Sequence, residues 1–270
     1  MRASRSPALA TAPVRPRSRL SGAIAAAALA TLALLPAGPA AAAELVVSAA
    51  ASLTNAFRAV AITYEQAHPG TKLVLNFGAS DVLMQQIVQG APADVFASAD
   101  QQAMDKAQAE HMIVPGSRRD FAANALVMIE PADSALKLGA PRDLLRDDVR
   151  RVAYGNPASV PVGRYTRDAL EDARLWQAVS AKGVPAQNVR QALDYVARGE
   201  VDAGFVFATD AAAMPSRVRI VAQVPTRTAV TYPIAVTARS RQKDEAARFV
   251  DFVLSAEGQA LLARHGFRTR

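Results

Sequence analysis

The sequence contains no cysteine, only three histidines and one tryptophan among its 270 residues. The absence of cysteine excludes a disulfide framework, a catalytic thiol, a cysteine-based metal site and a lipid anchor attached through cysteine. The histidines, His68, His111 and His265, are far apart in the sequence. They form neither a metal-binding motif nor part of a Ser-His-Asp arrangement. We therefore expect neither a cofactor nor an enzyme of these classes.

Long hydrophobic runs are also missing, apart from one near the start of the chain. Residues 1–21 carry five arginines and no acidic residue, residues 22–35 are uncharged and apolar, and a stretch of small residues follows. The apolar run is shorter than the roughly 18 residues that indicate a membrane span. This order is typical of a secretory signal peptide, which we expect over residues 1–43 with cleavage near Ala43, and a periplasmic location follows from it. A short membrane anchor is the alternative.

The excess of positive charge belongs mostly to this segment. Five of the 31 Lys and Arg residues and none of the 24 Asp and Glu residues lie in residues 1–43, so the net charge falls from +7 to +2 without them. No tract rich in Lys or Arg remains, and we expect no nucleic-acid partner. A weak positive balance is compatible with an anionic ligand.

From residue 44 onward, apolar runs alternate with helical patterns, which predicts an α/β fold with mostly parallel sheets covered by helices on both faces. The remaining length is enough for two such units. The predicted strands are Glu44–Ala50, Lys72–Phe77, Asp94–Ala97, Leu126–Ile129, Val149–Tyr154, Ala203–Phe207, Ile220–Val224 and Thr231–Val236. The predicted helices include Leu53–Gln66, Val82–Gln89, Gln101–Ala109, Thr166–Ala181, Val189–Arg198, Asp244–Ser255 and Gly258–His265.

Four of the predicted junctions at helix starts have the same character. They are rich in small residues, and three offer Ser or Asn as a helix cap: residues 50–54, 77–81, 161–163 and 187–189. A helix start presents unpaired N–H groups and a partial positive charge, so it can bind an anion without Lys or Arg. Each junction alone is better explained by ordinary capping. Whether the four converge cannot be read from their spacing.

Several segments, in this order along the chain, resemble one known family. They are AAASLTNAF (49–57), FGASDVL (77–83), GAPADVFASADQ (90–101), YGNPASVPVGRYTRDAL (154–170), NVRQAL (188–193), GFVFATDA (204–211) and GQALLARHGF (258–267). The chain is similar over nearly all of residues 44–270 to the periplasmic molybdate-binding proteins of molybdate ABC importers, and GAPADVFASADQ is the most specific segment.

The resemblance implies a two-lobed class II periplasmic-binding-protein fold whose lobes are joined by two crossing strands. One lobe would comprise residues 44–124 and 229–270, and the other residues 125–228. It further implies capture of molybdate for an ABC permease in the inner membrane, with no metal beyond the bound oxyanion. Tungstate is nearly the same size as molybdate and is expected to bind as well. A monomer is expected because a hinged cleft needs free lobes. The positions that match the family's ligand-binding residues are the hydroxyls of Ser52 and Ser80, the backbone amides of Val162 and Val189, and Phe207.

Phe207 departs from the family, which has tyrosine at this position. Phenylalanine lacks the hydroxyl, and a hydrogen bond to a charged group contributes about 1.5–3 kcal/mol. Thr209, Tyr165 and Tyr232 are the candidates for a replacement donor. A sulfate or other oxyanion receptor on the same fold therefore remains the main alternative.

Charged residues near these junctions admit two interpretations. Asp81 follows a predicted ligand serine, and we expect it to stabilise the first turn of its helix instead of facing the anion. Arg164 is expected either near the anion or on the surface. Asp94 and Asp100 are expected to be structural, with Asp100 capping a helix, because no His or Glu accompanies them.

Three other functions stay open, but the sequence lacks the residues that each of them needs. A secreted phosphate-ester hydrolase would need a metal cluster or an activated nucleophile, and the sequence shows neither. A ligand-sensing domain of a regulator would need a DNA-binding helix pair, which is not visible. A ferric-ion receptor would be expected to carry an adjacent pair of tyrosines, and none is present.

Overall fold

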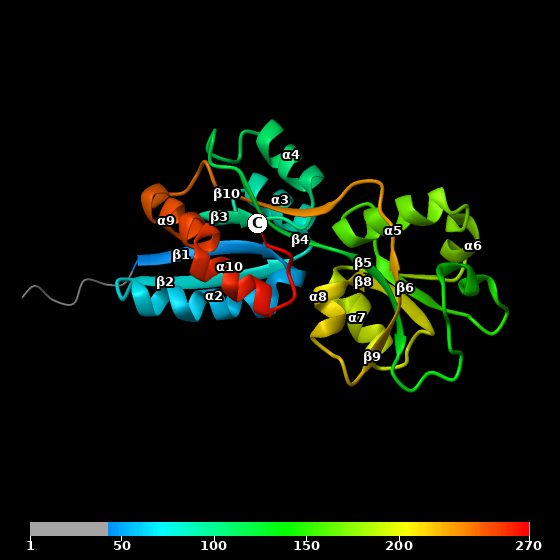
Figure 1. The fold of residues 1–270 in the computed structure, drawn as a ribbon. Coiled ribbons are helices and arrows are strands. Elements are labelled where there is room, and N and C mark those ends of the chain that lie inside the picture. The colour runs from blue at the N-terminus through cyan, green and yellow to red at the C-terminus, as the bar shows by residue number, and fades with distance from the viewer. Residues whose placement is uncertain (1–42, 270) are drawn as a thin grey trace, which may run out of the picture. The chain divides into compact units, whose positions relative to one another are not determined.

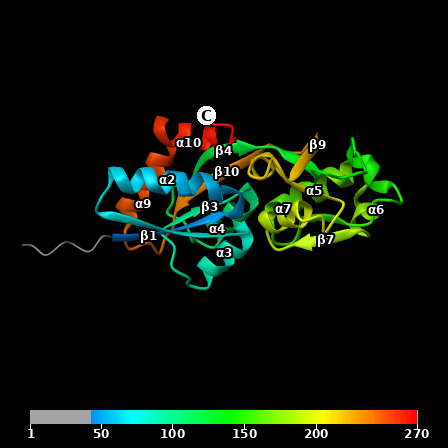
Figure 2. The ribbon, with the colours of Figure 1, turned by 90° about the horizontal axis from the view of Figure 1, so that it is seen from below.

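The structure, a computed structural model, describes residues 43–269. The predicted export signal lies outside the described residues except for Ala43, which begins the first strand. Among residues 43–269, no helix is both long enough and apolar enough to cross a membrane. The described chain builds two five-stranded sheets with their helices (Figures 1 and 2).

The first sheet has the strand order β2-β1-β3-β10-β4. Its strands are β1 (Ala43–Ala50), β2 (Thr71–Gly78), β3 (Val95–Ala97), β4 (Arg119–Asn124) and β10 (Val230–Val236). In Figures 1 and 2 its two faces are covered by different helices, α2 (Thr54–Ala67), α9 (Lys243–Leu254) and α10 (Ala256–Arg264) on one and α3 (Ser80–Val88) and α4 (Gln101–Ala109) on the other. We call this sheet and its helices the first half.

The second sheet has the order β7-β6-β8-β5-β9. Its strands are β5 (Leu126–Pro131), β6 (Val152–Gly155), β7 (Gly183–Ala186), β8 (Ala203–Phe207) and β9 (Val218–Val224). Four α-helices belong to it, α5 (Pro161–Asp172), α6 (Trp176–Ser180), α7 (Val189–Ala197) and α8 (Ala208–Ala212), with the short 3-10 helix η2 (Pro141–Leu145). We call these elements the second half.

Both sheets are mixed, and they are mixed in the same way. Three strands in each are parallel, β2-β1-β3 and β7-β6-β8, while β10 and β4, like β5 and β9, pair antiparallel. The prediction of mostly parallel sheets therefore holds for the strands joined through helices. It does not hold for the strands that carry the chain between the halves, from β4 into β5 and from β9 back to β10 (Figure 1).

Hydrophobic spacing predicts the packing of the helices correctly. The helix predicted over Leu53–Gln66 is α2, and its apolar residues are buried, with Phe57, Val60 and Tyr64 fully inaccessible. Helix α2 ends at Ala67, and Pro69 and Gly70 follow it closely. The predicted helix 166–181 is wrong in two respects: α5 begins five residues earlier at Pro161, and the chain breaks between α5 and α6, where Arg174 has a φ of 59°.

Candidate functional site

A small cavity lies at the junction of the two halves, at the ends of strands and the starts of helices. Its free volume is about 10 Å³, close to the minimum that holds one water molecule. All four predicted junctions contribute to its wall, which is formed by Ala50, Ala51, Ser52, Gly78, Ala79, Ser80, Ala99, Val160, Pro161, Val162, Asn188, Val189 and Phe207. The five residues that the resemblance implied, Ser52, Ser80, Val162, Val189 and Phe207, are therefore brought together in one place.

The two serines present hydroxyl groups that already accept a hydrogen bond or are paired with a hydroxyl. Ser80 Oγ accepts a bond from the Ala99 N–H at 3.0 Å, and Ser52 Oγ lies 2.9 Å from the Tyr232 hydroxyl. Ser52 lies inside a short 3-10 helix, η1 (Ala51–Leu53), whose capping position is Ala50, and the capping position of α3 is Ala79, so neither serine is a cap. The expectation that these serines are helix caps is therefore wrong, and their hydroxyls remain free to serve the cavity.

The backbone amides of Val162 and Val189 lie in the first turns of α5 and α7. Amides in a first turn have no partner inside their own helix. Among the hydrogen bonds of residues 43–269, none uses either of these two N–H groups. Asn188 caps α7 by accepting a bond from Gln191 N at 3.0 Å, as its sequence position predicted. Both helix starts thus direct an unpaired donor and a partial positive charge toward the cavity wall.

The start of α5 is held against β6 by a close backbone contact at Gly163. A Cβ atom on this residue would lie 1.9 Å from the Gly155 carbonyl oxygen. Glycine is therefore the residue that lets the helix start approach the strand end. Pro161 occupies the first helical position, where its missing N–H costs nothing.

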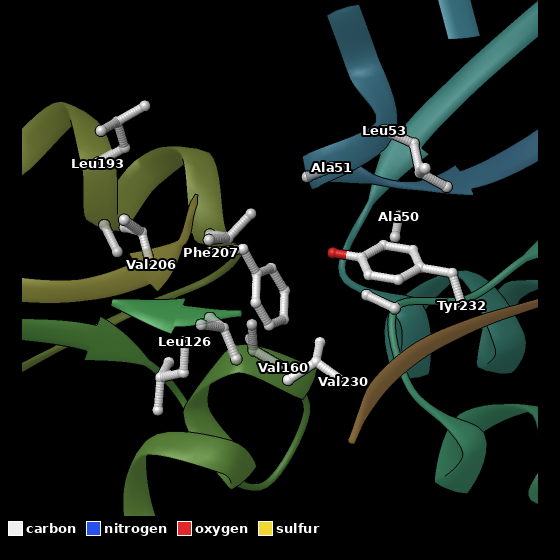
Figure 3. Close-up of a cluster of buried hydrophobic side chains, with 14 of the residues drawn as sticks. Ala50, Ala51, Leu53, Leu126, Val160, Leu193, Val206, Phe207, Val230 and Tyr232 are labelled. Carbon is white, nitrogen blue, oxygen red and sulfur yellow. The ribbon is translucent and has the colours of Figure 1, made fainter. Parts of the chain in front are cut away.

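Phe207 ends β8 and is 1 % exposed. Its ring centroid lies 5.9 Å from that of Tyr232 and 6.1 Å from that of Tyr165. Figure 3 shows the Phe207 and Tyr232 rings extending toward one another from the two halves, near Ala50 and Ala51. The position of the family tyrosine thus contributes an apolar ring to the cavity wall.

None of the three candidates for the missing hydroxyl lines the cavity itself. Tyr232 reaches it only through Ser52, and the Thr209 hydroxyl accepts from Asn124 Nδ2 at 2.9 Å. Tyr165 lines a different cavity, beside Arg164 and Thr231.

Arg164 is buried, so the expectation of a surface position is wrong, and it does not belong to the cavity wall. It is 6 % exposed and joins the halves: Nε lies 3.0 Å from Asp100 Oδ2, and Nη2 lies 2.6 Å from Asp81 Oδ2. Lys106 Nζ completes the group at 2.7 Å from Asp81 Oδ1. Burial by itself lowers the pKa of Arg164, but Asp100 and Asp81 outweigh it and raise that pKa, so the guanidinium stays charged. We call these four residues the charge cluster.

The acidic residues fill the structural positions expected of them. Asp81 lies in the first turn of α3, and Asp100 caps α4 by accepting from Ala103 N at 3.1 Å. Asp94 accepts bonds from Val46 N and from the Ser240 hydroxyl at 2.8 and 2.6 Å. Within residues 43–269, no three His, Cys, Asp or Glu side chains come together as metal ligands.

Sequence reasoning missed two supporting residues. Ala99 lies inside the segment GAPADVFASADQ, and its backbone N–H engages Ser80; a backbone contact leaves no signal in the residue type. Asn124, at the end of β4, is 2 % exposed and bonds both Tyr232 and Thr209. The sequence carries no signal for this role, because β4 was not predicted and burial appears only in the folded structure.

The chain is similar in sequence and in structure to known binding proteins. The molybdate-binding protein ModA of Escherichia coli (strain K12) is 35 % identical over 235 residues, covering 83 % of this chain and 88 % of that protein. The periplasmic molybdate-binding protein of Azotobacter vinelandii superposes with a TM-score of 0.74 at 26 % identity, covering 84 % of this chain and 100 % of that one.

The fold is shared more widely than the sequence. The sulfate-binding protein SubI of Mycobacterium tuberculosis H37Rv superposes with a TM-score of 0.72 at 19 % identity, covering 84 % of this chain and 87 % of that one. This likeness concerns the fold alone. The sequence profile of bacterial extracellular solute-binding proteins matches residues 45–268. The chain therefore belongs to the family of bacterial extracellular solute-binding proteins.

Proposed function

We propose that this protein captures molybdate, and tungstate with it, as the substrate-binding protein of an ABC importer. The observation that carries the proposal is that one small cavity is lined by all five residues, Ser52, Ser80, Val162, Val189 and Phe207. Hydroxyl and N–H groups are donors, and no carboxylate belongs to the wall formed by the described residues. Such a set suits a deprotonated oxyanion.

Neutral donors are sufficient for a dianion at this place. Hydrogen bonds to a charged group contribute about 1.5–3 kcal/mol each, and helix starts add their partial positive charge. Molybdate and sulfate share charge and shape but differ in bond length, so fixed donors select between them by distance. Phosphate near neutral pH retains a proton, which a wall of donors does not accommodate. Molybdate and tungstate are nearly equal in size, and we propose that both bind.

The proposed binding event joins two lobes. We propose that the lobes are residues 44–124 with 229–270 and residues 125–228, and that their closure around the anion creates the surface that a membrane permease recognises. The protein would then act outside the cytoplasm, as a monomer and without a catalytic step. Its solute-binding relatives support this assignment.

A sulfate receptor is the second candidate, because Phe207 removes a donor that the resemblance led us to expect. Thermal unfolding of residues 44–270 with molybdate, tungstate, sulfate and phosphate separates the two. An anion at about 100 times its dissociation constant adds about 2.7 kcal/mol of stability. For a protein of this size, that corresponds to a rise in Tm of roughly 5–11 °C. We expect the rise with molybdate and tungstate only.

Substitutions test whether the cavity is responsible for the rise. Ser52→Ala and Ser80→Ala should each weaken molybdate binding by about ten- to a hundredfold through loss of one charge-assisted bond. Ser117→Ala is the matched control, since this half-buried serine bonds Val114 O at 2.8 Å away from the cavity wall. A rise in Tm with sulfate alone, or molybdate binding that survives both serine substitutions unchanged, would contradict the proposal.

A further inference from the structure

We propose that Tyr232 and Asn124 are positioning residues that orient the Ser52 hydroxyl, so that its single proton points to the bound oxyanion. The inference rests on the proposed function. It starts from a buried chain of polar side chains behind the cavity, in which Tyr232 is inaccessible and Asn124 is 2 % exposed. This row of side chains begins with Asn124 at the end of β4, continues with Tyr232 in β10 and ends at Ser52.

The orientation of the Asn124 amide is fixed by its neighbours. Its Oδ1 accepts a bond from the Ala125 N–H at 2.9 Å, so the NH₂ group faces the other way. That group donates to Thr209 Oγ1 at 2.9 Å and to the Tyr232 oxygen at 3.3 Å. Both donors of the amide are therefore used, and the Tyr232 oxygen is an acceptor in this contact.

The direction of the next bond follows from counting protons. Tyr232 has one O–H donor, and among the hydrogen bonds of the described residues its only other partner is Ser52 Oγ at 2.9 Å. If Ser52 donated instead, the phenol proton would be buried without an acceptor, which is costly. Tyr232 therefore donates to Ser52. Burial and the nearby Asp210 raise the pKa of Tyr232 well above its ordinary value, so the phenol keeps this proton.

The bond from Tyr232 determines which hydrogen bonds the Ser52 hydroxyl can still make. A hydroxyl has one donor and two acceptor lone pairs. With one lone pair occupied by Tyr232, the proton of Ser52 has no acceptor among residues 43–269 and is available to the cavity that Ser52 lines. Ser80 is arranged in the same way, since it accepts from Ala99 N. Both serines are thus prepared as donors before an anion arrives.

Tyr232→Phe tests the inference because it removes the hydroxyl and keeps the ring. We expect the molybdate dissociation constant, measured by titration calorimetry, to rise about two- to tenfold, the effect of one neutral hydrogen bond. Tyr64→Phe is the matched control. Tyr64 is a buried tyrosine of the same half whose hydroxyl bonds Glu245 Oε1 at 2.5 Å, away from the cavity wall, and its loss should leave the dissociation constant unchanged.

A double-mutant cycle distinguishes positioning from a general structural role. If Tyr232 acts through Ser52, Tyr232→Phe should have no further effect on molybdate affinity in a Ser52→Ala background. An equal loss of affinity in both backgrounds would overturn the inference, as would an unchanged dissociation constant for the single variant. If the unchanged protein bound no molybdate, the proposed function itself would fail, which is a different result.

Asn124→Asp provides a second variant that does not depend on Tyr232→Phe folding. A carboxylate accepts the phenol proton, so Ser52 would have to donate to Tyr232 and would lose its bond to the anion. We expect Asn124→Asp to weaken molybdate binding. In the Ser52→Ala background the relative loss of affinity should be smaller, because only the repulsion between the new carboxylate and the anion remains. Equal losses in the two backgrounds would contradict the proposed chain of bonds.

Discussion

Arg164→Met removes the centre of the charge cluster while it keeps a long side chain in place. The guanidinium contacts Asp100 and Asp81 across the two halves, and the three side chains are each only 6–7 % exposed. With Lys106, the cluster sums to zero charge. After the substitution it carries one net negative charge that burial prevents water from solvating fully.

The expected loss of stability depends on the partners that Asp81 and Asp100 keep after the substitution. Removing one member of a buried ion pair costs about 3–5 kcal/mol when the other charge is left alone. Here Asp81 keeps Lys106, and Asp100 keeps the N–H of Ala103. We therefore expect a loss of about 2–3 kcal/mol, below that range. For a protein of this size the Tm would fall by roughly 5–10 °C.

The loss of affinity has a separate cause. Asp81 directly follows the predicted ligand Ser80 in α3. An uncompensated charge repels a dianion by about 3 kcal/mol if about 10 Å separates the two and the effective dielectric constant is about 20. Screening by dissolved salt reduces this repulsion. We expect molybdate to bind about ten- to a hundredfold more weakly, since each tenfold change corresponds to about 1.4 kcal/mol.

Combining Arg164→Met with Asp100→Asn tests this reasoning. The double variant is neutral again but still lacks the bridge between the halves. Calorimetry with molybdate should show that affinity is largely recovered, while thermal unfolding without molybdate should show that the stability is not. If affinity stayed low in the neutral double variant, the bridge and not the charge would control binding. An Arg164→Met protein with wild-type affinity would refute the electrostatic argument entirely.

Three further predictions use other parts of the molecule. Phe207→Tyr should restore a donor and tighten molybdate binding by about tenfold or more; paired titrations measure this, and equal or weaker affinity in the variant would contradict it. Gly163→Ala should displace the start of α5, because its Cβ would lie 1.9 Å from the Gly155 carbonyl oxygen; a lower Tm and lost molybdate binding are expected, and wild-type values would show that the contact is not needed. Burial raises the pKa of Asp210 from 3.8 to about 6 against the opposing charge of Arg190, so the folded protein binds this proton more tightly than the unfolded chain. The free energy of unfolding should therefore fall by about 3 kcal/mol as the pH rises from about 4 to about 6, and urea unfolding should show no such decline from this group in Asp210→Asn.

The sequence predicts those elements whose own residues carry a strong pattern. The apolar face of α2 and the buried runs of β1 and β8 were recognisable because burial on one or both faces imposes hydrophobic periodicity. The four junctions were recognisable from their small residues. Their convergence was implied by the resemblance and could not be derived from spacing, because it depends on how two sheets meet.

Elements with weak patterns were missed for physical reasons. Strand β7 reads Gly-Val-Pro-Ala and lies at the edge of its sheet, where proline is tolerated and strands are short. Strand β4 has arginine, aspartate and asparagine among its six residues. The role of Arg164 was also missed, because the residues next to an arginine in the sequence do not show whether its side chain is buried. Its partners, Asp81 and Asp100, come from the other half of the molecule.

The donors of the candidate site are neutral, whereas Asp81, which follows Ser80 in the sequence, is bonded to Arg164. An arginine on a long side chain could follow anions of different size, and it would favour any dianion. The donors here are fixed separately: Ser80 by Ala99 N, the α5 amide by the contact at Gly163, and the α7 amide by the Asn188 cap. Donors that cannot move distinguish anions of equal charge by the length of their bonds. We therefore expect a substitution that loosens one of these supports to weaken molybdate binding more than sulfate binding. The preference for molybdate over sulfate would then fall, while the affinity for sulfate would change less.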